Sequence, residues 1–165
     1  MPQNKPSKSE KKREVLALQA LGEQLIELTE EQLRDMELPE NLFDAVTAAS
    51  RIKSRGALRR QHQLIGKLMR GVDPEPIRRA IEDLQRQERA DKEIFRRAEH
   101  WRDRIVEGRH DGLNEFLEVT GCSNGDLSSM LNEYIAVPQE SGRRALRRRI
   151  FRQVHEELTK ATIGR

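Results

Sequence analysis

The stretch between Pro76 and Gly108 constrains the fold most, because it contains no glycine or proline and carries two separate apolar stripes. The stripes, one before and one after the polar run 85–91, comprise Ile77, Ile81 and Leu84, then Ile94, Ala98, Trp101 and Ile105. A helix that is apolar at both ends and polar between them is typical of a spine shared by two small bundles. We expect one continuous helix, because the alternative of two helices joined by a polar turn would lack a helix-breaking residue.

Apolar residues recur at helical spacing along most of the remaining chain, and no strand-like alternation of any length appears. Charged residues make up 36% of the chain and apolar residues 35%, a composition also found in disordered chains. A disordered chain, however, has no reason to keep its apolar residues at helical spacing. The sequence therefore predicts an all-α fold in which two small helical subdomains are joined by a long spine helix. We expect the subdomains to be residues 9–90 and 91–165, each including half of the long helix, and residues 1–8 to be a disordered basic tail.

Local signals predict where most helices begin and end. The candidate N-caps are Ser7 or Ser9 for a first helix, Thr29 (in a capping box with Gln32) for a short second turn, and Asn124 or Asp126 for a late short helix. Asp73-Pro74 suits the start of the long helix, and a brief helix after Gly108 should end near Gly121. The last helix is expected to bury a stripe spaced strictly by four residues, Leu146, Ile150, Val154 and Leu158.

Positive charge is concentrated between Ala45 and Val72, where a helix is expected after Pro39 and Gly56 could either kink or break the chain. This stretch contains no Asp or Glu, although the whole chain has a net charge of only +3. Its seven cations are Arg51, Lys53, Arg55, Arg59, Arg60, Lys67 and Arg70. Such a surface attracts a polyanion through its summed field and the release of counterions.

A second cationic cluster lies in the last expected helix, where no acid occurs from Ser141 to His155. Besides Arg149, it contains Arg143, Arg144, Arg147, Arg148 and Arg152. Aromatic residues make up only 4% of the chain, so the pattern favours phosphate contacts over base stacking, and structured RNA over single strands. Acids from other helices could still neutralise either cluster. His62, within the first cluster, is interpreted as a helix-packing residue or as one that faces RNA.

No set of residues with a catalytic mechanism is apparent. Gly66-Lys67 is not a P-loop, because Leu68 occupies the position of the magnesium-binding Ser or Thr. The four histidines share no i, i+3 or i, i+4 spacing, and Cys122 has no identifiable base. A small hydrolase or nuclease, which is one alternative, would need carboxylates such as Asp103 or Glu107 to converge on one site near the arginines. We therefore expect no enzyme activity, no metal and no cofactor or small-molecule substrate.

The N-terminus has no apolar segment typical of a signal peptide, no run reaches the length of a membrane span, and a single cysteine cannot form an internal disulfide. These features favour a cytoplasmic protein without a membrane partner.

Several motifs resemble the DarP/YjgA family of bacterial ribosome-associated proteins. They are Arg51-Ile52-Lys53, Arg59-Arg60-Gln61 and the run 63–70 (QLIGKLMR), with supporting matches at 73–78, 101–105 and 149–152. The resemblance implies an all-helical, non-enzymatic factor whose two helical subdomains are joined by a long helix. It also implies association with the large ribosomal subunit during late assembly, with 23S ribosomal RNA as the polyanion.

The chain departs from that family in two places. Its N-terminus is short and basic, whereas many members begin with an acidic extension, and the helix expected at 126–135 lacks the usual arginines. An RNA contact through that helix is therefore not expected. We hypothesise that the arginines at 143–152 take over some of its role in contacting RNA.

The resulting hypothesis is a monomeric factor that binds precursors of the large ribosomal subunit through both cationic clusters, which one chain could use to bridge two RNA helices. The alternative is a helical adaptor that binds an acidic protein.

Overall fold

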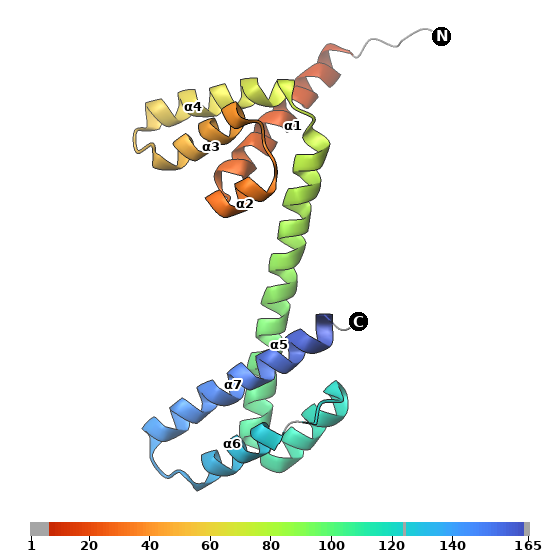
Figure 1. The fold of residues 1–165 in the computed structure, drawn as a ribbon, viewed down its shortest axis with the longest axis vertical. Coiled ribbons are helices and arrows are strands. Elements are labelled where there is room, and N and C mark those ends of the chain that lie inside the picture. The colour runs from red at the N-terminus through yellow and green to blue at the C-terminus, as the bar shows by residue number, and fades with distance from the viewer. Residues whose placement is uncertain (1–6, 124, 164–165) are drawn as a thin grey trace, which may run out of the picture. The chain divides into compact units, whose positions relative to one another are not determined.

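The computed structural model describes residues 7–123 and 125–163, and every element within them is a helix (Figure 1). In chain order these are α1 (Lys8–Ile26), α2 (Glu30–Asp35), α3 (Glu40–Arg51), α4 (Arg55–Leu68), the 3-10 turn η1 (Met69–Gly71), α5 (Pro74–Thr120), α6 (Gly125–Ala136) and α7 (Glu140–Ile163). The all-α prediction is confirmed. The tail expected at residues 1–8 falls mostly on residues 1–6, which lie outside the described residues, as does Asn124.

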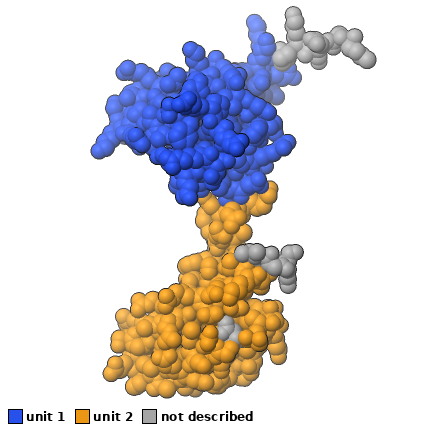
Figure 2. Space-filling view, viewed as in Figure 1, with its two compact units in different colours: residues 1–85 blue, residues 86–165 orange. Residues whose placement is uncertain are grey.

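The chain divides into two compact units, residues 1–85 (unit 1) and 86–165 (unit 2) (Figure 2). Unit 1 builds its core from α1 to α4, η1 and the first turns of α5, and unit 2 builds its core from α5, α6 and α7. Helix α5 is continuous through the polar run 85–91, as predicted, and contributes one apolar stripe to each core.

The core of unit 1 holds α4 against α1 and α3. Ile65 and Met69 are buried in it, and Gly22 on α1 allows the close approach, because a Cβ atom there would lie 2.8 Å from the Cγ2 atom of Ile65. The Gln61 side chain donates a hydrogen bond of 2.7 Å to the backbone carbonyl of Ala45 on α3. Helix α4 is therefore fixed to both neighbours along one side.

The local signals place most helix starts correctly. Ser7 caps α1 in a capping box with Glu10, and Thr29 caps α2 in a capping box with Gln32. Gly56 neither kinks nor breaks a helix, because the break comes earlier, at residues 52–54, and Gly56 lies in the first turn of α4. The predicted Leu146, Ile150, Val154 and Leu158 stripe of α7 is buried.

Helix α5 changes direction at Arg109, whose backbone angles (φ 52°, ψ −128°) are not helical. The residues after the kink fold back on those before it, since the Arg104 guanidinium donates two hydrogen bonds, of 2.6 and 2.8 Å, to the Glu115 carboxylate. Gly112 makes this return possible, because a Cβ atom there would collide with the backbone carbonyl oxygen of Arg104. The rings of Trp101 and Phe116 then meet in the core.

We predict that Gly112→Ala destabilises the protein by about 1–3 kcal/mol, because the added methyl group forces two backbone segments apart. Gly108→Ala is the matched control, since a Cβ atom at Gly108 meets no atom within 4 Å and alanine favours helix. Urea unfolding followed by circular dichroism measures both. Equal stability of the two variants would contradict the close approach at Gly112.

Candidate nucleic-acid interface

The first cationic set is the group of seven cations predicted between Ala45 and Val72, and the structure exposes all of them. Helix α4 supplies Arg55, Arg59, Arg60 and Lys67, Arg51 ends α3, Lys53 lies in the connection 52–54, and Arg70 lies in η1. The helical period places the four α4 cations away from the buried side of that helix, which contains Ile65. Burial of the apolar stripe therefore turns the positive charge toward solvent, as predicted.

Six members of the first cationic set form no ion pair within the described part of the chain. Arg51 is the exception, and its pair is long, with 4.0 Å between a guanidinium nitrogen and a carboxylate oxygen of Glu30. A pair of this length between exposed side chains contributes little energy. The set therefore keeps nearly all of its charge available to an external anion.

A groove of about 540 Å³ lies between α1 and α4, with Arg55 and Arg59 in its lining. His62 also lines it, partly buried, with its Nδ1 atom 3.8 Å from a carboxylate oxygen of Glu23 on α1. His62 therefore packs between two helices, which is the first of its two interpretations, and it lies beside exposed cations.

The second cationic set comprises Arg143, Arg144, Arg147, Arg148 and Arg152 of α7. Three of these arginines already have a partner: one on α5, one in the first turn of α7 itself, and one in the connection that precedes α7. Arg147 donates to the Asp103 carboxylate of α5 at 2.6 Å. Arg144 lies 3.6 Å from Glu140, and Arg143 donates to the backbone carbonyl of Val137 at 2.9 Å.

Arg148 and Arg152 are exposed and form no ion pair within the described residues. Their neighbour Arg149 pairs with Glu133 of α6. The two predicted sets therefore differ: counting partners among residues 7–123 and 125–163, the first set is almost uncompensated and the second retains two uncompensated arginines.

Asp103 is the centre of an ion-pair cluster in unit 2. Its two carboxylate oxygens accept hydrogen bonds of 2.9 Å each from the Arg102 side chain, and Arg147 donates to one of them. The hydrogen bond from Arg102 lowers the pKa of Asp103 below its ordinary value, partial burial opposes this, and the charges of Arg102 and Arg147 lower the pKa further. Asp103 is thus a structural carboxylate held ionised by arginines.

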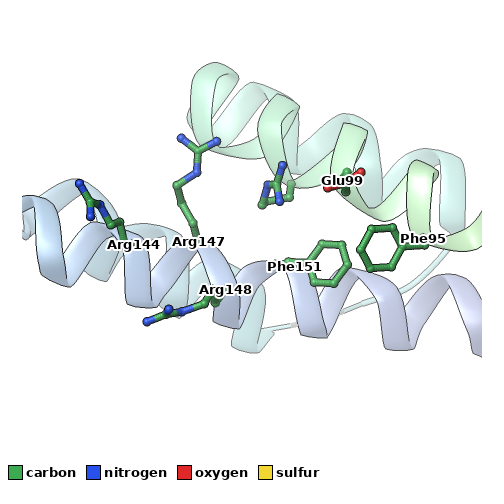
Figure 3. A pocket seen from close by; sticks show the side chains of 7 residues that line it. Phe95, Glu99, Arg144, Arg147, Arg148 and Phe151 are labelled. Atoms are coloured by element: carbon green, nitrogen blue, oxygen red, sulfur yellow. The ribbon is translucent and has the colours of Figure 1, made fainter.

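An aromatic cluster beside the second cationic set is a feature that the sequence analysis missed. The rings of Phe95 on α5 and Phe151 on α7 lie 5.0 Å apart in an edge-to-face arrangement (Figure 3). The ring of His155 lies 6.4 Å from that of Phe95 and 5.9 Å from that of Phe151. Both phenylalanines lie one position away from a buried residue, Ile94 or Ile150. Their position beside the core stripe, rather than in it, is the sequence signal that could have identified them.

No group of three or more metal-binding side chains occurs within the described residues. Cys122 lies within hydrogen-bond distance of a hydroxyl, with its Sγ atom 3.0 Å from the Oγ1 atom of Thr120. The Asp103 carboxylate is occupied by Arg102 and Arg147.

None of the helices in the described ranges combines the length and the apolar character that crossing a membrane requires.

Comparison with known proteins identifies the family. The family model described as "Dual-action ribosomal maturation protein DarP" matches residues 4–162. The chain belongs to the DarP family. Curated DarP proteins include one from Thiobacillus denitrificans that is 46% identical over 113 residues, which cover 68% of this chain and 64% of the relative. Another, from Methylobacillus flagellatus, is 48% identical over 114 residues, which cover 67% of this chain and 61% of the relative.

The match to these two DarP relatives spans somewhat less than two thirds of their length. Within this DarP family chain, the motif run 63–70 occupies the second half of α4 and the start of η1. The same run therefore supplies the buried Ile65 and Met69 and the exposed Lys67 and Arg70.

The Asp103 cluster generates a pH prediction for this DarP family member. Because the folded pKa of Asp103 lies below its unfolded value, its stabilising contribution is complete above the unfolded pKa and is lost as pH falls through the folded pKa. Since its side chain is 39% exposed, we expect Asp103→Asn to cost only about 1 kcal/mol near pH 7. The difference from wild type should shrink progressively as the pH falls below the unfolded pKa of an aspartate, about 3.9.

Urea unfolding at a series of pH values measures this difference. Glu107→Gln is the control, because it removes an exposed carboxylate of the same helix that forms no ion pair among the described residues. If both variants lost the same free energy of unfolding at every pH, the role assigned to Asp103 would be wrong.

Proposed function

We propose that this chain binds 23S ribosomal RNA during late assembly of the large ribosomal subunit, without catalysing a reaction. The observation that carries the proposal is the first cationic set, in which six exposed cations have no ion pair within the described residues. A surface of this kind gains affinity for a polyanion because its cations release the counterions that are condensed on the polyanion. Membership of a family described as a ribosomal maturation protein makes ribosomal RNA the polyanion of choice.

Phosphate contacts are the recognition mode that suits the first cationic set. Arginine and lysine side chains that project from one side of a helix reach phosphates and position the protein without reading bases. An arginine with no existing ion pair makes such a contact without first breaking one. We therefore assign the main contacts to the first cationic set, and assign weaker contacts in the second set to Arg148 and Arg152.

Two cationic sets on one chain can strengthen each other, because binding of one raises the effective concentration of the other near the RNA. We propose that the factor acts in this way as a cytoplasmic monomer that needs no cofactor. Its partners are precursors of the large subunit.

Simultaneous replacement of Arg59, Arg60 and Lys67 by Gln should weaken binding to large-subunit precursor particles and reduce its dependence on salt. Each phosphate contact contributes about 0.9 to the slope of log affinity against log salt concentration, so the slope should fall by about 2–3. Cosedimentation of the full chain with precursor particles over a salt series measures both quantities.

The matched control replaces Arg34, Lys92 and Lys160 by Gln, which changes the net charge equally at exposed cations that already form ion pairs. This control should keep the wild-type slope. Salt-independent binding by wild type, or equal losses in both triple variants, would refute the proposal. Retention of the chain on a ribosomal protein after nuclease treatment would favour the adaptor alternative.

A further inference from the structure

We infer that unit 2 contains a stacking site for one unpaired RNA nucleotide, with its base against Phe95 and its phosphate on the arginines of α7. The inference rests on the proposed RNA binding and adds a contact of a different kind to it. Its basis is a solvent-open pocket of about 450 Å³ between α5 and α7, which Phe95, Phe151 and four arginines help to line (Figure 3).

Phe95 is the element of this pocket that demands an explanation. Its side chain is 48% exposed, although the adjacent Ile94 supplies the core contact of this turn of α5. Phe151 supports the Phe95 ring from one side, at 5.0 Å between centroids and 65° between planes. Phe151 is itself covered by the Arg102 guanidinium, 5.8 Å from its ring centroid. Phe95 is therefore a supported ring with an open surface.

The charges around this ring determine which ligand suits it. Arg102, Arg144, Arg147 and Arg148 line the pocket, against the single acid Glu99 among its described lining residues. Asp103 compensates Arg102 and Arg147, but Arg148 has no ion pair within the described part of the chain. Figure 3 shows Arg144, Arg147 and Arg148 on the α7 side of the pocket. An aromatic surface beside excess positive charge matches a ligand with a flat apolar face and a negative group.

A nucleotide has both features, and it must be unpaired to use them. In a duplex the faces of each base are covered by its neighbours, whereas bases in bulges and loops are open to stacking on aromatic side chains. Such stacking is worth about 1–3 kcal/mol per base and tolerates any base. The volume of the pocket lies within the range of about 300–1,000 Å³ found for small-ligand sites. Glu99 can accept hydrogen bonds from N–H groups on the edge of the base.

The test uses two RNA hairpins that contain the fluorescent base 2-aminopurine, unpaired in a one-nucleotide bulge or paired within the stem. Stacking on Phe95 should quench the unpaired fluorophore, and the full chain should bind the bulged hairpin about tenfold more tightly than the paired one. Phe95→Leu should abolish quenching and preference together, because leucine keeps apolar surface but lacks a ring. Phe95→Tyr should preserve both.

Thermal unfolding followed by circular dichroism checks that each variant is folded. We expect both variants to fold, because Phe95 is exposed and its replacement removes little core packing. If Phe95→Leu quenches and discriminates like wild type, while both bind the paired hairpin with a steep salt slope, the stacking site is wrong and RNA binding stands. If wild type binds neither hairpin even at low salt, both proposals fail. A third result would assign the pocket to a protein partner and overturn the inference. In it, wild type retains a ribosomal protein after nuclease treatment, Phe95→Leu does not retain it, and the two quench the fluorophore equally.

Discussion

The narrow apolar stripe on each helix is the constraint on which the rest of this structure depends. Helix α4 has one buried residue, Ile65, and partly buried neighbours such as Leu58, so only one side of it can face the core. Burial of that side leaves most of the helix surface in water. The charges there are not needed for packing, and so they are available to determine what the surface attracts.

Local rules of sequence were sufficient for much of the fold. A capping box such as Thr29 with Gln32 involves groups three residues apart, and a helical stripe involves one turn at a time, so both are visible in the sequence. The cross-element contacts of unit 2 were not visible, because the pair between Arg147 and Asp103 joins residues 44 positions apart. For the same reason, the aromatic contact between Phe95 and Phe151 was missed, and the second cationic set looked less compensated than it is.

The two cationic sets would contribute to RNA binding at different energetic cost. An exposed arginine without an ion pair among the described residues, such as Arg59, loses only its hydration when it contacts a phosphate. Arg147 would in addition have to leave or share the Asp103 carboxylate, which also accepts hydrogen bonds from Arg102. Charge density along the sequence therefore overstates the contribution of the second set to RNA binding relative to that of the first set. The Asp103 cluster instead joins α7 to α5 through Arg147. The same two helices carry Phe95 and Phe151, whose contact supports the exposed Phe95 ring.

The division of α5 between two cores has a consequence for synthesis of the protein. Unit 1 takes its last core residue from the chain at Ile81, and the core of unit 2 begins only at Ile94. Domains made first generally fold first on the ribosome, and helical structures rich in local contacts fold quickly. The nascent chain can therefore present a finished cationic surface on α4 while the arginines of α7 have yet to be translated.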